Sequence, residues 1–359
     1  MQPYEELVSE LTYRSFMHGE AYQNGGTPYR MTTKKPLPYR DLVKRAAGMI
    51  EDADCILVGG GSGLSAAGGG DFYYSDNASY RAHFGKFAEK SGFKGAFAGS
   101  FYPWPTPESR WGYLATFLDT TINAPLRQPY KDLDALISDK DFFVLTTNQD
   151  TQFLKIYPWD KVAEIQGDHR FFQCGNCCTD EVWDSVGPVG EMIGAMGDGL
   201  EVPSDLVPRC PHCGREAFPW VRGYGNFLQG ELYEEQYRKV SEWIEAHRER
   251  KVLFFELGVG RITPAFIQEP FWMLTAQLPH AHYISVNNVT QFLPEAIEDR
   301  GIAIRKDIAK ALAAVAKERR RRAHLHHVCL FFLRSRKEVI RIEFHRKRVV
   351  SHDAPPIPT

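Results

Sequence analysis

The sequence lacks any apolar run that approaches the roughly 20 consecutive apolar residues of a membrane-spanning helix. Its first residues also lack a basic region followed by an apolar stretch, so we expect no secretory signal peptide. An excess of one charge is lacking as well. The 43 basic side chains stand against 45 acidic ones, which argues against a dedicated nucleic-acid binder. We therefore expect a cytoplasmic protein with no membrane and no nucleic-acid partner.

Cysteine is scarce and unevenly distributed. Only seven cysteines occur in 359 residues, yet five of them fall between positions 174 and 213. In a chain without a signal peptide, two Cys-x-x-Cys pairs indicate metal ligation rather than disulfides. Four thiolates in a tetrahedral set bind a structural zinc ion, and the spacing predicts the ligands Cys174, Cys177, Cys210 and Cys213. Cys178 is then a spare thiol that is either inert or an alternative ligand.

Apolar runs that end in small or polar residues alternate with helical patterns over most of the chain. The runs lie at 55–58, 142–145, 252–257 and 282–286, and helical patterns lie at 39–52, 228–249 and 307–318. Such alternation favours an α/β fold with a doubly wound, parallel sheet of the Rossmann-like type. Ligands bind at the carboxyl edge of such a sheet.

Two segments interrupt this alternation. Residues 72–125 are rich in aromatic residues, glycine and proline, which indicates a helical insertion, and residues 170–222 carry the clustered cysteines of a small zinc-ribbon module. Four consecutive arginines follow at 319–322. They indicate a poorly ordered tail, with a localisation or nucleic-acid patch as the alternative. The predicted division is therefore an N-terminal extension (1–37), a Rossmann-like domain (38–169 and 223–316), the zinc module (170–222) and a basic tail (317–359).

A glycine-rich segment follows the first apolar run, from Gly59 to Ala66. Glycines at such a site allow a tight turn and let backbone N–H groups approach phosphates closely. Residues 61–66 fit a loose G-x-G-x-x-A pattern. No acidic residue caps a second strand about twenty residues later, as one does in dehydrogenases. An ordinary glycine-rich turn therefore stays open as the alternative.

Polar or small residues also end the other apolar runs. Asn148 and Asp150 lie one residue apart after the second run, so both can face one cleft, although a turn capped by these side chains explains them too. Gly258 and Val259 follow the third run, and Asn287 follows the fourth. We expect these positions at the ligand-binding edge of the sheet.

Taken together and in this order, the motifs resemble those of sirtuins over residues 40–312. Residues 61–65 resemble the G-A-G-I-S loop of that family, Thr147–Asp150 resembles its T-Q-N-I-D segment, and Gln166 stands at its H-G position. The resemblance implies NAD as a substrate and one structural zinc ion. It also implies NAD contacts from Gly59, Gly61, Ser62, Gly63, Ser65, Asp71, Phe72, Asn148, Asp150, Gln166, Gly258, Val259 and Asn287.

Departures from the sirtuin pattern fall within the site. Gln166 replaces the catalytic histidine, Asn226 replaces a glutamate of the acyl-peptide site, and Tyr73 replaces an arginine. These departures resemble the macrodomain-linked sirtuins called class M. That resemblance implies protein ADP-ribosylation, a lipoyl-carrier protein as a possible substrate and a macrodomain as a possible partner. It also adds Arg222, otherwise an ordinary surface arginine, to the candidate catalytic residues Asn148, Asp150 and Gln166.

The residue at position 166 bears directly on the reaction. An amide donates and accepts hydrogen bonds but does not take up a proton near neutral pH, whereas sirtuin deacylation needs a general base. ADP-ribosyl transfer stops before that step. We therefore expect an NAD-dependent protein mono-ADP-ribosyltransferase. The alternatives are a deacylase with another base, such as His169, and a non-catalytic sensor of NAD or ADP-ribose.

Overall fold

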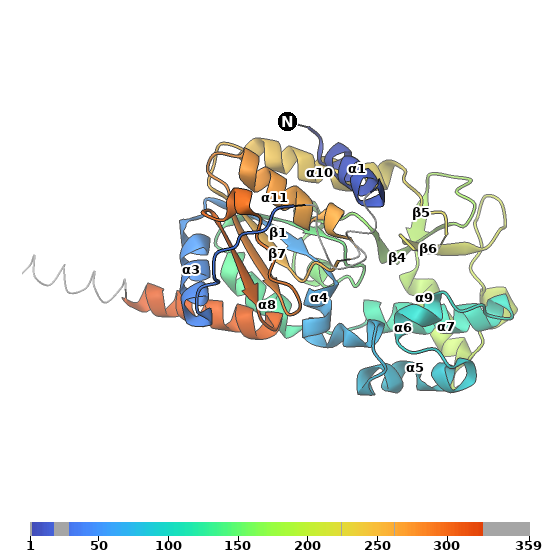
Figure 1. Cartoon of the computed structure of the whole chain (residues 1–359). Helices are drawn as coiled ribbons and strands as arrows, with labels where there is room; N and C mark the ends of the chain where they lie inside the picture. The colour runs from blue at the N-terminus through green and yellow to red at the C-terminus, as the bar shows by residue number, and fades with distance from the viewer. Residues whose placement is uncertain (1, 18–28, 224, 262, 326–359) are drawn as a thin grey trace, which may run out of the picture.

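A six-stranded parallel sheet forms the centre of the fold (Figure 1). The computed structural model describes residues 2–17, 29–223, 225–261 and 263–325. The predicted α/β, Rossmann-like architecture is confirmed, although two short edge strands were not predicted. In spatial order the strands are β3 (Val162–Glu164), β2 (Asp141–Thr146), β1 (Cys55–Gly60), β7 (Val252–Leu257), β8 (His282–Asn287) and β9 (Gly301–Arg305).

The chain builds this sheet outward in two directions from β1. Strands β2 and β3 lie on one side of it, and β7, β8 and β9 lie on the other. The order therefore reverses between β1 and β7, and ligands bind outside the carboxyl ends of the strands at such a reversal. Gly60, Thr146 and Leu257 are neighbours in register at these ends. The loops after the three strands consequently share one edge.

Helices cover both faces of the sheet, because successive strand side chains point to opposite faces. Leu57 packs in one apolar cluster with α10 (Glu231–His247) and α11 (Gln268–Gln277). The adjacent Ile56 packs in a second cluster with α3 (Tyr39–Asp52), α8 (Gln128–Ile137) and a helix over 308–325. Burial on both faces explains why the central strands appear in the sequence as continuous apolar runs.

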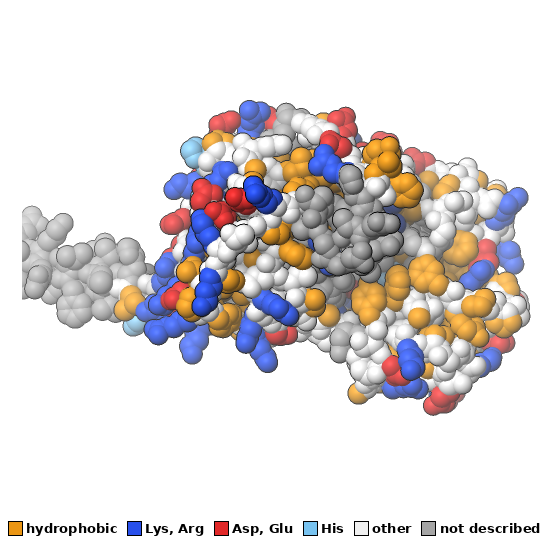
Figure 2. Space-filling view, in the orientation of Figure 1, with side chains coloured by type: hydrophobic (Ala, Val, Ile, Leu, Met, Phe, Trp, Pro, Cys, Tyr) orange, Lys and Arg blue, Asp and Glu red, His pale blue; other side chains and the backbone are white. Residues whose placement is uncertain are grey.

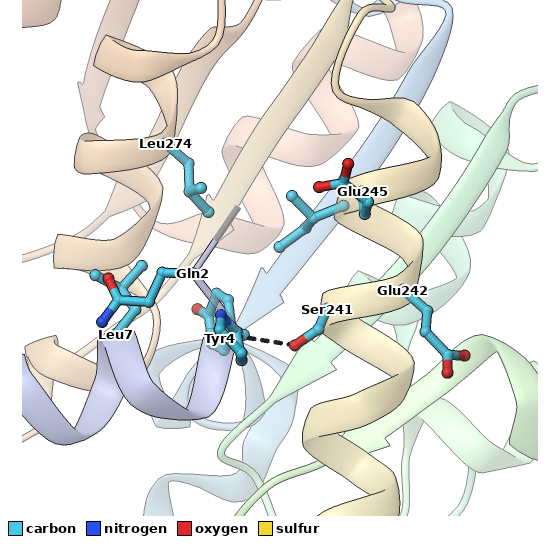
Figure 3. A pocket seen from close by; sticks show the side chains of 9 residues that line it. Gln2, Tyr4, Leu7, Ser241, Glu242, Glu245 and Leu274 are labelled. Carbon is cyan, nitrogen blue, oxygen red and sulfur yellow. Dashed lines mark hydrogen bonds between the residues drawn. The ribbon is translucent and has the colours of Figure 1, made fainter.

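An N-terminal helix, α1 (Tyr4–Met17), packs on the side of α10 and α11. The sequence predicts only an extension at 1–37, but Tyr4, Leu7 and Leu11 follow helical spacing and are buried. The Tyr4 hydroxyl donates to the Phe266 carbonyl at 2.8 Å, and its backbone N–H donates to Ser241 Oγ at 2.9 Å. Figure 3 shows the contact between Tyr4 and Ser241 in a surface pocket of about 270 Å³.

The predicted zinc module and helical insertion pack together as one lobe. The module contains an antiparallel sheet in the order β5-β4-β6 and a helix. Its elements are β4 (Gly167–Cys174), β5 (Val182–Asp184), β6 (Ala217–Val221) and α9 (Val186–Met196), and those of the insertion are α5 (Ala78–Ser91), α6 (Ala96–Ser100) and α7 (Pro107–Ile122). Trp111 of the insertion meets Phe172 of the module edge to face, with ring centroids 5.4 Å apart. A shared aromatic core therefore joins the two segments.

The helix over 308–325 includes the arginines at 319–322 that the sequence analysis places in a poorly ordered tail. The structure corrects that expectation as far as residue 325. Arg319 donates to the Leu136 carbonyl at 2.7 Å, and Arg322 pairs with Glu51 at 2.5 Å. Lys and Arg side chains gather over α3 and this helix (Figure 2). The rest of the predicted tail, 326–359, lies outside the described residues.

Within the ranges that the structure describes, no helix is both long enough and apolar enough to cross a membrane.

Candidate functional site

A cavity of about 400 Å³ lies at the carboxyl edge of the sheet. Its walls come from the loops after β1, β2, β6 and β7, from the turn between β3 and β4 with the start of β4, and from the helical insertion. All four candidate catalytic residues line it, and so do two serines of the glycine-rich segment: Asn148, Asp150, Gln166, Arg222, Ser62 and Ser65. A cavity of this volume suits a small organic ligand.

The glycines of the first loop are required by close packing against the loop after β7. Gly63 donates its N–H to the Gly258 carbonyl at 2.9 Å. A Cβ on Gly61 would lie 2.7 Å from Val259 Cα, and a Cβ on Gly258, whose φ is +69°, would lie 2.5 Å from the Leu64 nitrogen. These glycines therefore shape the edge of the site by holding two loops together, while Ser62 and Ser65 face the cavity.

Asp150 is held in a buried polar network. Ser65 Oγ donates to its Oδ2 at 2.5 Å, and the Tyr130 hydroxyl donates to the same oxygen at 3.4 Å. Arg127 Nη1 lies 3.8 Å from that oxygen, and the side chains of Arg127 and Asp150 are only 8% and 4% exposed. A buried carboxylate needs such compensation. Arg127 enters from the N-terminal end of α8, and no local motif in the sequence marks it as a site residue.

Asn148 is oriented by the first loop. Its side-chain nitrogen donates to the Gly61 carbonyl at 3.1 Å and to the Tyr130 hydroxyl at 3.4 Å. The residue lines the cavity, and the oxygen of a side-chain amide is a hydrogen-bond acceptor. Asn148 can therefore accept a hydrogen bond from a ligand.

Gln166 occupies the turn between β3 and β4. Its backbone carbonyl accepts from the Arg222 N–H at 2.9 Å and from Gln149 Nε2 at 3.1 Å. Its own side-chain Nε2 is buried and has no hydrogen-bond partner within the part of the chain that is described. Gly167 follows at φ +86°, where a Cβ would lie 1.9 Å from the Trp220 carbonyl oxygen. The Gln-Gly pair thus gives a tight turn and an unused buried donor at the cavity.

Arg222 lies at the mouth of the cavity and is exposed. Its guanidinium lies over the rings of Phe227 at 5.2 Å and Phe266 at 5.5 Å. Arg222 is therefore supported by aromatic faces, and a permanent positive charge stands beside the opening.

His169 also lines the cavity, although only 1% of the residue is exposed. Its Nδ1 lies 2.9 Å from Thr121 Oγ1, and its ring meets Phe117 edge to face. Burial lowers the pKa of His169 to about 4. The imidazole is consequently neutral at pH 7 and is a weak base.

Gly59, Phe72 and Asn287 are not among the described residues that line the cavity. Gly59 packs beneath α11, where a Cβ would lie 2.6 Å from Phe271. Phe72 is buried in the aromatic core of the lobe, and Asp71 begins the short helix Asp71–Tyr73. Asn287 donates to the Val259 carbonyl at 2.9 Å and so fixes the loop after β7. The cavity also has an aromatic wall that was not predicted from the sequence and consists of Tyr73, Tyr74, Phe97, Phe101 and Phe117.

Four cysteine sulfurs of the module lie within 4.8 Å of one another, those of Cys174, Cys178, Cys210 and Cys213. Two of the pairs, Cys174–Cys213 and Cys178–Cys210, are 3.6 and 3.5 Å apart. Zn–S bonds of about 2.3 Å place the sulfurs of a tetrahedral site roughly 3.8 Å apart. The cluster therefore fits a structural zinc ion.

The cluster corrects one predicted ligand, because Cys178 takes the place assigned to Cys177. The chain turns at Cys177, whose φ is 49° and whose N–H donates to the Cys174 carbonyl at 3.0 Å. The Cys177 sulfur lies instead 3.7 Å from the Asn226 carbonyl oxygen. Spacing alone allows either cysteine, and the turn selects the second.

No protein-family model matches the chain. It is 28% identical over 271 residues to a protein ADP-ribosyltransferase from Staphylococcus aureus, with 75% of this chain and 85% of that protein covered. It is 31% identical over 274 residues to a probable bifunctional ADP-ribose hydrolase/ADP-ribosyltransferase from Fusarium oxysporum, with 73% of this chain covered. The chain spans only 44% of that second protein.

Solved structures that match the chain include a mutant Sir2 homologue in complex with ADP-ribose. That structure is 15% identical, has a TM-score of 0.48 and covers 78% of this chain and 98% of its own. A complex of Sir2 with a p53 peptide and NAD is 17% identical, has a TM-score of 0.45 and covers 77% of this chain and 98% of its own.

Proposed function

We propose that this chain is an NAD-dependent protein mono-ADP-ribosyltransferase of the sirtuin type. It cleaves NAD to nicotinamide and transfers the ADP-ribosyl group to a protein. The observation that carries the proposal is the amide of Gln166, which lines the cavity together with Asn148 and Asp150. The names of the two relatives, both of which include ADP-ribosyltransferase, support the same reaction.

The cavity fits a polar nucleotide, since it offers hydrogen-bonding atoms that the described part of the protein does not use. Gln166 Nε2 and His169 Nε2 are both buried there without partners. Such orphaned polar atoms are costly unless a ligand or water satisfies them. Asn148 adds a side-chain amide that lines the same cavity.

The reaction needs a cation-stabilising site more than it needs a base. When NAD is bound, its glycosidic bond breaks with oxocarbenium character, and an acceptor on the substrate protein attacks the ribose carbon. Asp150 supplies a buried negative charge close to this centre, and Ser65 and Arg127 hold it in place. Asn148 and Gln166 bind and orient the ligand through their amides. No step of a simple transfer requires Gln166 to take up a proton.

Arg222 is placed to act on the charged parts of the reactants. A guanidinium forms paired hydrogen bonds with phosphate or carboxylate groups, and this one stands at the cavity mouth. In this proposal Arg222 binds a ligand phosphate or a carboxylate of the substrate protein.

A deacylase is the second candidate, and His169 is the observation that favours it, because it is a titratable nitrogen in the cavity wall. Its pKa of about 4 reduces its strength as a base. A general base contributes roughly 100- to 10,000-fold and works best with a pKa near the operating pH. Transfer without a base therefore accounts better for this site.

The finer assignment is also a proposal. We propose that the chain belongs to the macrodomain-linked class M sirtuins and acts in the cytoplasm. Its substrate would then be a lipoyl-carrier protein, and its partner a macrodomain. The support is the substitution at Gln166 and the ADP-ribose hydrolase named in the second, longer relative.

A labelling experiment tests the proposed function. The purified protein is incubated with adenine-labelled NAD and a cell extract from its source, and both free nicotinamide and protein-bound label are measured. We expect label on a discrete protein band, and we expect the Asn148→Ala variant to lose it. Nicotinamide release without protein label would indicate deacylation or hydrolysis, and NAD binding without release would indicate a sensor.

A further inference from the structure

His169 stands in the cavity wall with its two ring nitrogens in different surroundings. It lies on β4, three residues after Gln166, and the edge-to-face contact with Phe117 at 5.4 Å fixes the plane of its ring. Nδ1 meets Thr121 Oγ1 at 2.9 Å. Nε2 is buried and has no hydrogen-bond partner among the described residues.

Thr121 determines which nitrogen carries the proton. Its hydroxyl has one hydrogen, which it donates to the Leu118 carbonyl at 2.9 Å. This single hydrogen cannot serve both contacts, so both are hydrogen bonds only when His169 Nδ1 carries the ring hydrogen and donates it to Thr121 Oγ1. In the neutral ring, Nε2 must then present a lone pair. The structure thus holds a buried acceptor at the wall of the cavity.

Gln166 supplies the complementary group. Its Nε2 is a buried donor without a partner in the described ranges, and its residue lines the same cavity. A ligand group that satisfies both atoms must accept from Gln166 and donate to His169. A hydroxyl does both, whereas a carboxylate has no hydrogen to donate and an ammonium has no lone pair to accept with.

We propose that His169 and Gln166 form a hydroxyl-binding subsite, in which His169 Nε2 accepts a hydrogen bond from a sugar hydroxyl that accepts from Gln166. The inference rests on the proposed function, which supplies a ribose as the ligand. Gln166 is part of the motif that marks the site in the sequence, but His169 is a further ligand-binding residue. Thr121 is a positioning residue, since it acts only through the histidine.

Binding of ADP-ribose tests the subsite, because ADP-ribose carries the ribose hydroxyls and lacks the nicotinamide carboxamide. The matched variant is His169→Phe, which keeps a ring against Phe117 and leaves the Thr121 hydrogen on the Leu118 carbonyl. By calorimetry we expect ADP-ribose to bind roughly 5- to 30-fold more weakly to this variant, the loss expected for one hydrogen bond. Equal affinity for wild type and variant would overturn the subsite.

Analogues of NAD that lack one hydroxyl of the nicotinamide ribose locate the contact. Removal of the bound hydroxyl and the His169→Phe change should each weaken binding, and the two together should weaken it little further. Fully additive losses for both the 2′-deoxy and the 3′-deoxy analogue would overturn the contact. A loss of affinity for NAD with none for ADP-ribose would overturn it too, because it would place His169 against the carboxamide.

A spectroscopic measurement on the unmutated chain is independent of how the variant folds. In protein labelled with ¹⁵N-histidine, the non-protonated Nε2 of His169 should change its chemical shift when ADP-ribose binds, while Nδ1 stays protonated. An unchanged Nε2 signal in saturated protein would contradict the inference. If the wild type binds neither NAD nor ADP-ribose, the proposed function fails. If it binds both, but neither the His169→Phe affinity nor the Nε2 chemical shift changes, only the subsite fails.

Discussion

The Ser65 hydroxyl donates a hydrogen bond to the Asp150 carboxylate at 2.5 Å. This contact joins the end of the glycine-rich loop after β1 to the loop after β2, its neighbour in the sheet. Arg127 approaches the same carboxylate oxygen from α8. The negative charge that the proposed reaction requires is therefore fixed by three separate segments.

Replacement of Arg127 should lower the unfolding free energy, because Asp150 would then be a buried carboxylate without a counter-charge. In Arg127→Met the carboxylate keeps its hydrogen bonds but loses its counter-charge, and breaking a buried pair costs about 3–5 kcal/mol of unfolding free energy. Chemical denaturation measures this loss. Adding Asp150→Asn should restore a large part of the stability without restoring nicotinamide release. If Arg127→Met is as stable as the wild type, the pair does not hold Asp150.

The cysteine cluster predicts different outcomes for two adjacent residues. Cys178→Ser should reduce the bound zinc well below one ion per chain and lower the melting temperature, because a tetrahedral site loses a thiolate. The matched control Cys177→Ser should keep one zinc ion. Metal analysis and thermal unfolding measure both. Zinc loss in Cys177→Ser alone would restore the assignment made from spacing.

The contact between the two glycine loops should tolerate no side chain at position 258. Gly258→Ala places a Cβ 2.5 Å from the Leu64 nitrogen at a positive φ, so it should lower stability by about 1–3 kcal/mol and weaken NAD binding. Gly85→Ala is the control, since its Cβ meets nothing within 4 Å in helix α5. It should stabilise the chain by roughly 0.5–1 kcal/mol. Equal stabilities for the two variants would contradict this account of the loops.

Buried His169 should make the protein less stable in mild acid. Its pKa in the folded chain is about 4, below the value of 6.5 for an exposed histidine, so the unfolded chain binds the extra proton. Stability is therefore complete above pH 6.5 and is lost as the pH falls toward 4. Relative to His169→Phe, the wild type should lose about 2 kcal/mol between pH 7 and pH 5. Parallel stability curves for the two proteins would show that His169 titrates normally.

The sequence was most informative where burial extends over a whole strand. Runs such as Val252–Leu257 are apolar throughout because helices cover both faces of the sheet. Strand β3, at only three residues, is too short to show a periodicity. The apolar positions of helix α1 do follow helical spacing, but polar residues surround them. Its packing on α10 and α11 becomes evident only in the fold.

The sequence allowed us to predict the site residues that follow the strands, but not the residues from other elements that support them. Asn148, Asp150 and Gln166 are contiguous with recognisable segments, and all of them line the cavity. Arg127 reaches Asp150 from another element, so no local pattern reveals it. The choice between Cys177 and Cys178 depends on one backbone turn that spacing does not specify.

The most direct test of the central claim is a balance of products in a single reaction. The protein is incubated with NAD, an acetylated peptide and the acceptor protein that the labelling experiment identifies. Released nicotinamide, protein-bound ADP-ribose and lost acetyl groups are then quantified in the same reaction. Because Gln166 cannot act as a base, the account predicts that protein-bound ADP-ribose equals released nicotinamide and that the peptide keeps its acetyl group. Loss of one acetyl group for each nicotinamide released, with no ADP-ribose on protein, would contradict it.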